Sequence, residues 1–371
     1  MKKSFQTIPS IFMLAALPAV SAFAANPIGK LYTMSNAATG NEVLVYDRLS
    51  DGSIMQTGHV PTNGNGTSTG LGNQGAMTLS KDGFYLFAVN AGSHSVSSFR
   101  LTPNGLVLVE AESSGGIRPV SVTEDRGRLY VLNAGDETNP GNITGFYIQP
   151  GGKLAPIANS TQVLSSTTAS TGAAQIQFSD DGQQLIVTEK ATNLILTYTL
   201  DAEDRAGAPK VNDSAGNTPF GFAVGKRNQL FVSNAEGGTA DISTLSSYRL
   251  STNGELQTLS PEVATNETAA CWVALTPDGR YAYTTNTASG TISAFRIGFN
   301  GKAVLSDNDA GIAGEGSGPI DMIVGPESRF LYTLNAGTDS IASFAVGLDG
   351  RLTLLTTMTG LPDGANGLIA R

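Results

Sequence analysis

The chain has 371 residues, 22 Lys and Arg against 31 Asp and Glu, a formal net charge of −9 and 44 glycines. This acidic balance disfavours nucleic acid, anionic lipid and multiply phosphorylated ligands as partners, because each of them favours a basic surface. The many glycines, the plentiful Ser and Thr and the lack of long charged amphipathic segments are typical of an all-β protein with many turns.

The first 24 residues, MKKSFQTIPSIFMLAALPAVSAFA, have the form of a cleaved secretory signal. Two lysines precede an apolar run from Ile11 to Val20, and small residues end the segment at Ala24. Cleavage after Ala24 leaves residues 25–371 as a single domain, and the loss of two lysines changes the net charge from −9 to −11. We therefore expect a monomer without a membrane anchor, periplasmic or secreted. Its single cysteine, Cys271, leaves the core to stabilise it without disulfides.

A repeat of about fifty residues follows. Its signature is a short apolar strand that ends in Asn, as in LFAVN, LYVLN and LYTLN. A tight glycine turn precedes this strand, and an alternating strand with an aromatic residue near its end follows it. The signature ends at Asn36, Asn90, Asn133, Glu189, Asn234, Asn286 and Asn335. Four short antiparallel strands in each of seven copies predict a seven-bladed β-propeller.

The ends of the repeat predict how the ring closes. The N-terminal copy begins at its second strand, KLYTMSN, and the C-terminal GANGLIAR supplies a first strand with nothing after it. We expect the two to pair in one blade, which leaves no open sheet edge. We expect the signature Asn residues to adopt the left-handed conformation in the turn that leaves the second strand. One segment, 201–207, hints at a helical turn.

The loops predict which face binds. The turns between first and second strands, and between third and fourth strands, are uniformly short and lie on one face of a propeller. The connections between blades and the loops between second and third strands lie on the other face, where binding residues concentrate. The long connections are 57–75, 158–172, 207–219 and 308–318, and the enlarged loops are 134–142 and 235–243. We expect the site on that face and at the mouth of the central channel.

The candidate site residues lie at the starts of the innermost strands and in the adjacent loops. Glu189 is the most distinctive because the other six copies of the repeat carry Asn at its position. The candidates for catalysis are Glu189, Asp321 and Arg118, and those for ligand binding are Gln74, Gln175, Phe220, Trp272 and His94.

Structural interpretations of these residues stay open. Lys190 offers Glu189 a surface salt bridge, and Trp272 fits a packing role at the channel mouth. Arg118 has neighbouring acids to pair with, and His94 fits a surface loop. Two distant histidines cannot build a His-rich zinc or copper site. The acids of the segment 135–142 could hold a cation, but their spacing matches no calcium loop, so we predict neither a metal nor a cofactor.

The segment DGFYLFAVNAGSHSVSSFRLTPNG (82–105) resembles the repeat of the seven-bladed propeller lactonases. That family includes 6-phosphogluconolactonases and 3-carboxymuconate cyclases and is related to YVTN repeats. The resemblance covers the whole mature chain, and segments such as TPFGFAV and GPIDMIV are similar to an exported branch. The enzymatic members carry Gly-Pro-Arg-His at the start of one innermost strand. Here Ala174 and Gln175 occupy the Arg and His positions, and the family's nearby glutamate is kept as Glu189, displaced by one residue.

Two functions therefore stay open. In a periplasmic lactone hydrolase, Glu189 or Asp321 would activate water and Arg118 would stabilise the oxyanion, while Trp272 and Phe220 would enclose the sugar ring. The alternative is a non-catalytic propeller that binds a small ligand or an unidentified periplasmic protein partner through the same face. Convergence of Glu189, Arg118, Asp321 and Trp272 on one pocket would favour the enzyme, and scattered positions would favour the binding protein.

Overall fold

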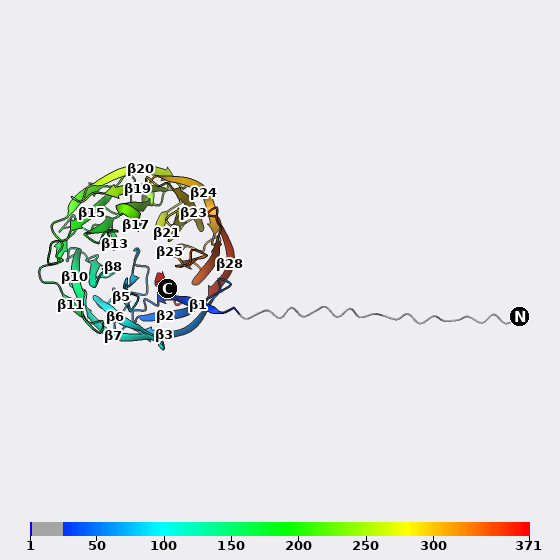
Figure 1. Cartoon of the computed structure of the whole chain (residues 1–371), viewed down its shortest axis with the longest axis horizontal. Helices are drawn as coiled ribbons and strands as arrows, with labels where there is room; N and C mark the ends of the chain where they lie inside the picture. Colours follow the sequence, from blue (N-terminus) through cyan, green and yellow to red (C-terminus); the bar gives the residue numbers. More distant parts are fainter. Residues whose placement is uncertain (2–24, 169) are drawn as a thin grey trace.

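Seven antiparallel sheets, six with four strands and one with a short fifth strand, form a ring around a central channel, as the repeat predicts (Figure 1). The computed structural model describes residue 1 and residues 25–168 and 170–371, so the predicted signal segment lies almost wholly outside the described residues. Within the described chain the only helical elements are two 3-10 turns, Lys226–Asn228 and Glu236–Gly238. No helix of this part is long and apolar enough to cross a membrane.

Each blade runs from an innermost strand at the channel to an outermost strand at the rim, and blades are numbered here in chain order from the one that contains β1. The innermost strands of blades 1 to 7 are β29 (Asn366–Ala370), β4 (Met77–Leu79), β8 (Pro119–Asp125), β13 (Ala173–Phe178), β17 (Pro219–Gly225), β21 (Ala270–Leu275) and β25 (Pro319–Val324). The second strands are β1 (Pro27–Met34), β5 (Tyr85–Asn90), β9 (Arg128–Asn133), β14 (Gln184–Glu189), β18 (Gln229–Asn234), β22 (Tyr281–Asn286) and β26 (Phe330–Asn335).

The third strands are β2 (Glu42–Leu49), β6 (Ser95–Thr102), β10 (Asn142–Ile148), β15 (Leu194–Thr199), β19 (Thr244–Leu250), β23 (Thr291–Ile297) and β27 (Ser340–Val346). The outermost strands are β3 (Ile54–Pro61), β7 (Gly105–Ser113), β11 (Leu154–Pro156), β16 (Lys210–Asp213), β20 (Leu256–Ala264), β24 (Ala303–Ile312) and β28 (Leu352–Thr359). In blade 3 a further short strand, β12 (Gln162–Val163), also pairs with β10.

The core lies between successive blades, where side chains of the second and third strands pack. The aromatic residue near the end of every third strand is at most 1% exposed, which explains why all seven copies of the repeat keep one. These residues are Tyr46, Phe99, Phe146, Tyr198, Tyr248, Phe295 and Phe344.

The signature asparagines are buried, and their side chains hold neighbouring segments together by hydrogen bonds. The expected left-handed conformation is wrong for all of them but Asn36, whose φ is 49°. The side chain of Asn90 donates hydrogen bonds to Ser95 Oγ (3.1 Å) and Ser97 Oγ (2.8 Å) on the neighbouring third strand. Asn234 and Asn286 donate to Ser or Thr hydroxyls in the same way. The Asn is therefore selected because its amide ties two strands together in a place without water.

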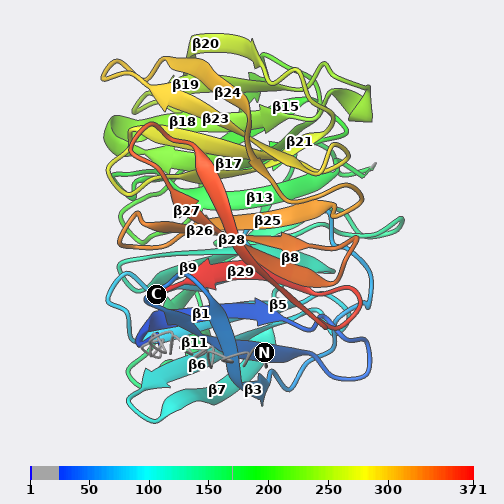
Figure 2. The same ribbon diagram turned by 90° about the vertical axis from the view of Figure 1, so that its right-hand side faces the viewer.

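Ring closure through the two ends of the chain is confirmed. β29 pairs with β1 over Leu31–Met34, and the backbone of Lys30 exchanges two hydrogen bonds with that of Arg371 (Figure 2). Arg48, 1% exposed, donates to both carboxylate oxygens of Glu327 in blade 7 (2.7 and 3.1 Å) and to the carbonyl oxygen of Arg371. One guanidinium thus joins the first blade, the last blade and the C-terminus.

The long loops gather on one face of the propeller, as predicted, but one segment predicted for that face lies on the other. We call the face with the blade connections the loop face and the opposite one the turn face. Residues 200–209 form an enlarged turn between β15 and β16 on the turn face, so the turns there are not uniformly short and 207–209 belongs to no blade connection. The expected helical turn at 201–207 is instead a turn with an isolated bridge between Leu200 and Ala206.

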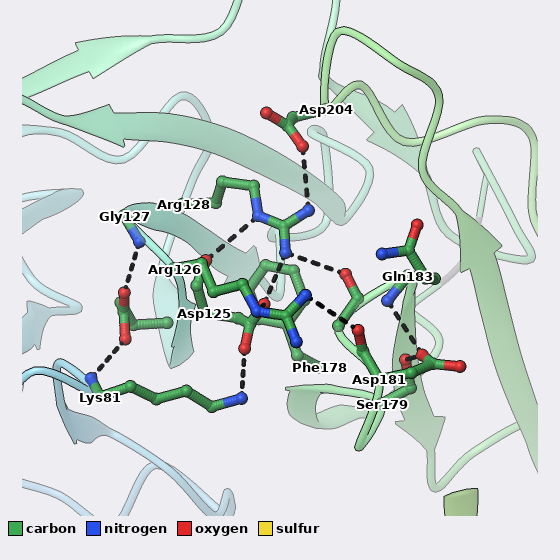
Figure 3. A network of polar contacts seen from close by, with 12 residues as sticks. Lys81, Asp125, Arg126, Gly127, Arg128, Phe178, Ser179, Asp181, Gln183 and Asp204 are labelled. Atoms are coloured by element: carbon green, nitrogen blue, oxygen red, sulfur yellow. Dashed lines mark hydrogen bonds and ion pairs between the residues drawn. The ribbon is translucent and has the colours of Figure 1, made fainter.

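An ion network holds blades 2, 3 and 4 together on the turn face (Figure 3). Asp125 is fully buried and pairs with Arg128 (Nη2 to Oδ2, 2.5 Å) and with Lys81 of blade 2. Arg128 also donates to Asp204 Oδ1 (2.9 Å) and to the carbonyl oxygen of Gly182 (3.0 Å), both in blade 4. Because Asp125 and Arg128 are both withdrawn from water, the charge of each is balanced by the ion pairs of this network rather than by solvent.

Candidate functional site

The loop-face mouth of the channel is occupied by the chain itself. Residues 71–75, which we call the plug, end the long connection between blades 1 and 2. The side-chain amide of Gln74 reaches across the channel to blade 6, where Nε2 donates to Val273 O (2.8 Å) and Oε1 accepts from Val273 N (3.0 Å). The backbone N–H of Gln74 donates to Ala174 O of blade 4 (3.1 Å). The expected ligand contact Gln74 is therefore a structural bridge.

Further bonds hold the plug on other blades. Asn73, 1% exposed, accepts a hydrogen bond from the indole N–H of Trp272 (2.8 Å) and donates its side-chain amide to Val120 O of blade 3. Gly75 O accepts from Val122 N (2.8 Å). The plug is thus bonded to blades 3, 4 and 6, and it closes the part of the mouth where a ligand was expected.

Gly221 makes room for the plug, and we predict that Gly221→Ala disturbs it. A Cβ there would overlap Gln74 Oε1 and lie 2.6 Å from Cys271 O. We expect a loss of about 1–3 kcal/mol in the free energy of unfolding, the usual cost of overpacking a filled site. Urea unfolding measures this loss, and hydrogen exchange should show faster exchange in residues 71–75. Gly58→Ala is the control because a Cβ there meets nothing within 4 Å. Equal stability and exchange in the two variants would show that the plug is loosely held.

Three of the expected ligand-binding residues also have structural partners. The Phe220 and Trp272 rings lie 4.8 Å apart, and both side chains are at most 8% exposed, so they form a floor beneath the plug. Gln175 exchanges two hydrogen bonds with the backbone of Phe222 (2.7 and 2.9 Å), which joins blades 4 and 5. The packing interpretation of Trp272 fits its buried position.

Glu189 is buried and fully engaged. It accepts hydrogen bonds from Ser165 N (2.9 Å), from the Ser165 hydroxyl and from Thr192 Oγ1 (2.6 Å). The carboxylate therefore ties the connection before blade 4 to the end of β14, the position that Asn occupies in the other blades. Its oxygens face donors of the fold rather than a pocket.

Asp321 lies in the central channel, on the turn side of the plug, and it lines a cavity of about 300 Å³. The side chain is 5% exposed, and Oδ1 accepts a hydrogen bond from Met322 N (2.8 Å). Burial raises the pKa of Asp321 to about 8, because the charged form is disfavoured away from water.

Arg118 and His94 lie together on the loop face, between blades 2 and 3. The backbone N–H of Arg118 donates to His94 Nδ1 (3.1 Å), so the neutral imidazole carries its proton on Nε2. Both residues have φ near +57°, and both are exposed. The Arg118 guanidinium makes no salt bridge with any acid of the described chain, so the expected structural pairing is not observed.

A pocket of about 500 Å³, here called the loop-face pocket, lies beside the plug between blades 3 and 4. Its charged lining residues are Arg118, Lys190, Asp136 and Glu137, and Leu71 of the plug forms part of its wall. Asp136 is exposed, and hydrogen bonds from Thr138 and Asn139 lower its pKa to about 2, so its carboxylate stays ionised. This pocket brings two cations and two carboxylates around one open volume.

Lys190 is the candidate functional residue that the sequence interpretation missed. It does not pair with Glu189; its ammonium lies 4.6 Å from the Phe220 ring and donates to Gly72 O. Burial lowers the pKa of Lys190 to about 8; Cys271 opposes this shift, and the charge of Arg118 adds to it. Its position in the repeat could have identified it from the sequence, because Ala or Thr follows the signature residue in the other six repeats.

The predicted catalytic residues do not converge. Arg118 lines the loop-face pocket, Asp321 lines the central cavity, and Glu189 and Trp272 line neither. Within residues 25–168 and 170–371 no group of three or more His, Cys, Asp or Glu side chains could hold a metal ion. By the criterion of convergence, the arrangement favours ligand binding over hydrolysis by a carboxylate base.

Comparisons with known proteins agree with the architecture. The family model described as lactonase, 7-bladed β-propeller, matches residues 31–167 and 246–361. The solved periplasmic gluconolactonase of Pseudomonas aeruginosa is 19% identical, with a TM-score of 0.67 over 91% of this chain and 98% of that one. A Bacteroides fragilis protein, described provisionally as a 6-phosphogluconolactonase, is 18% identical, with a TM-score of 0.71 over 93% and 98%. At these identities the likeness shows the fold alone. No curated protein matches the chain.

Proposed function

Because this chain belongs to the lactonase family of seven-bladed β-propellers, we propose that it binds a small sugar-derived acid, or the lactone of one, in the loop-face pocket. The observation that carries the proposal is the pair of cations, Arg118 and Lys190, on the wall of one 500 Å³ pocket. If residues 1–24 act as the predicted signal, binding takes place in the periplasm or outside the cell.

The two cations fit a single carboxylate. The Arg118 guanidinium is exposed and has its fork of N–H groups available for a carboxylate or a polarised lactone carbonyl. Lys190 is held in place by the Phe220 ring and Gly72 O, so its ammonium needs little further ordering when a ligand binds. A six-carbon acid is well within the volume of the pocket.

The two carboxylates on the same pocket set the expected selectivity. Asp136 and Glu137 supply acceptors for sugar hydroxyls, and they repel ligands that carry a second negative charge. A singly charged aldonate therefore suits the pocket better than a phosphorylated one. The names of the two solved relatives, a periplasmic gluconolactonase and a protein described provisionally as a 6-phosphogluconolactonase, support a sugar lactone or its acid as the ligand class.

Calorimetric titration with gluconate, glucose and 6-phosphogluconate tests this proposal. We expect gluconate to bind, and glucose to bind at least about tenfold more weakly because it lacks the charge-assisted hydrogen bonds. Added salt should weaken gluconate binding. Equal affinity for gluconate and glucose, or tightest binding of 6-phosphogluconate, would contradict the assignment of the pocket.

Ring opening of a lactone is the second candidate, and the lowered pKa of Lys190 favours it. As a free amine, Lys190 would take a proton from water as the water oxygen adds to the lactone carbonyl carbon, with Arg118 stabilising the oxyanion. The ring C–O bond then breaks, and the proton passes to the departing alkoxide.

This candidate predicts a specific pH profile. After subtraction of spontaneous hydrolysis, the rate of aldonolactone opening should rise with pH through about 8, the pKa of Lys190, and Lys190→Met should abolish the rise. A pH-stat assay measures both. If the protein gives no rate above the spontaneous one at any pH, the chain is a binding protein alone.

A further inference from the structure

The central channel contains a second cavity, which differs in chemistry from the loop-face pocket. It has a volume of about 300 Å³ and lies on the turn side of the plug. Toward the turn face its wall comes from the last residues of the innermost strands, and these side chains are partly exposed while the plug side is buried. This collar consists mainly of Val224, Leu275, Ile323 and Ile369, with Thr78 and Gln177. The cavity therefore opens toward the turn face.

Among the residues that the structure describes, Asp321 is the only charged one on the wall of this cavity. The strands that pack most against β25 are β21, β22, β26 and β29, and none of them carries Lys, Arg, His, Asp or Glu. Their titratable side chains are Cys271, Tyr281, Tyr283 and Tyr332. Across residues 25–168 and 170–371, no cation lies within salt-bridge distance of Asp321.

The neighbouring amides do not substitute for a cation. Gln74 and Gln175 lie at the same end of the cavity, but each uses its amide on the backbone of another blade. The backbone N–H groups of Met322 and Leu368 bond to the carboxylate, and they leave part of its acceptor capacity unused. Burying an ionised carboxylate without a charge partner costs free energy. A cation that pairs with Asp321 would remove much of this cost, which favours its binding. The pKa of Asp321 is raised to about 8 for the same reason, because burial disfavours the ionised form.

We propose that the central cavity is a second ligand site, which takes a small protonated amine with a short apolar body from the turn face. The ammonium would pair with Asp321, and the apolar body would pack against the collar of Val224, Leu275, Ile323 and Ile369. A divalent metal ion fits less well, because it needs several oxygen ligands and no group of three acids lies here within the described chain. The plug separates this site from the loop-face pocket, so the two are independent.

Titration of the full chain with butylammonium, butanol and butyrate tests the proposal. We expect butylammonium to bind at least about tenfold more tightly than the other two, because only it forms a charge-assisted bond with Asp321. Its affinity should rise as the pH increases from about 6 to 9, because Asp321 ionises over this range while the alkylammonium, like lysine, stays protonated.

Two variants locate the site. Asp321→Asn should remove the preference for the amine and the pH dependence, and its Oδ1 can still accept from Met322 N, so we expect it to fold. Asp213→Asn, at the exposed end of β16, removes the same charge elsewhere and should bind like the wild type. Equal binding of butanol and butylammonium, an unchanged affinity in Asp321→Asn, or no binding of butylammonium at millimolar concentration would each overturn the proposal. So would loss of amine binding in Asp136→Asn with Glu137→Gln, which would place the amine in the loop-face pocket.

Discussion

Removal of residues 366–371 will abolish cooperative folding of the propeller. The truncation deletes β29, which leaves β1 without its inner partner and removes the backbone carbonyl of Arg371 that Arg48 binds. Arg48 is 1% exposed, and Leu31 and Leu368 pack in the same core cluster, so the loss combines hydrogen bonds, a buried cation and apolar burial. We expect a loss on the order of 5 kcal/mol or more, comparable with the whole stability of an ordinary domain.

Circular dichroism during heating measures this effect. The control is Arg371→Ala in the full-length chain, which keeps the backbone bonds to Lys30 and should melt close to the wild type. A truncated chain that still melts in one sharp transition near the wild-type temperature would show that the pairing of the two ends is dispensable.

Asp125→Ala will be the most damaging single substitution on the turn face. It removes the shared carboxylate of Lys81, Arg126 and Arg128. Arg128 keeps Asp204 as its one remaining ion pair in the described chain, and it is too buried for water to replace the lost carboxylate. Breaking one partner of a buried pair costs about 3–5 kcal/mol. Urea unfolding should show this as a large shift of the midpoint. Asp125→Ala with Arg128→Met should recover part of the loss, because the uncompensated charge is gone.

Glu255→Ala is the matched control for this prediction. Glu255 pairs with Lys210 across 3.2 Å at an exposed position, so water can replace the lost partner. We expect its unfolding midpoint to stay near that of the wild type. If both substitutions shift the midpoint equally, the network of Figure 3 contributes no more than a surface ion pair.

The architecture was predictable because it is repeated and local. Strand, turn, buried aromatic and signature Asn recur within each blade, and seven copies with complementary ends define the ring. The conformation of the asparagines was not predictable from the turn-forming preference of Asn alone. The amides of Asn90, Asn234 and Asn286 bond to Ser and Thr on the next strand, and that context overrides the preference.

The site was less predictable because its contacts join distant parts of the chain. Gln74 and Val273 are 199 residues apart, and nothing in the repeat indicates that one crosses the channel to the other. Once the plug fills the mouth, Trp272 and Phe220 become support for it, and Gln175 joins blades 4 and 5. Glu189 stands out in the sequence because it replaces Asn in one blade. Its burial among the donors Ser165 and Thr192 depends on the path of a loop that the repeat does not describe.

The measurement that tests the central claim most directly is gluconate titration of the wild type, of Arg118→Gln with Lys190→Met, and of Asp321→Asn. If the loop-face pocket is the ligand site, the wild type and Asp321→Asn will bind gluconate equally, and the double variant will bind at least about tenfold more weakly. If instead the double variant binds like the wild type while Asp321→Asn does not, the ligand enters the channel and our assignment of the site is wrong.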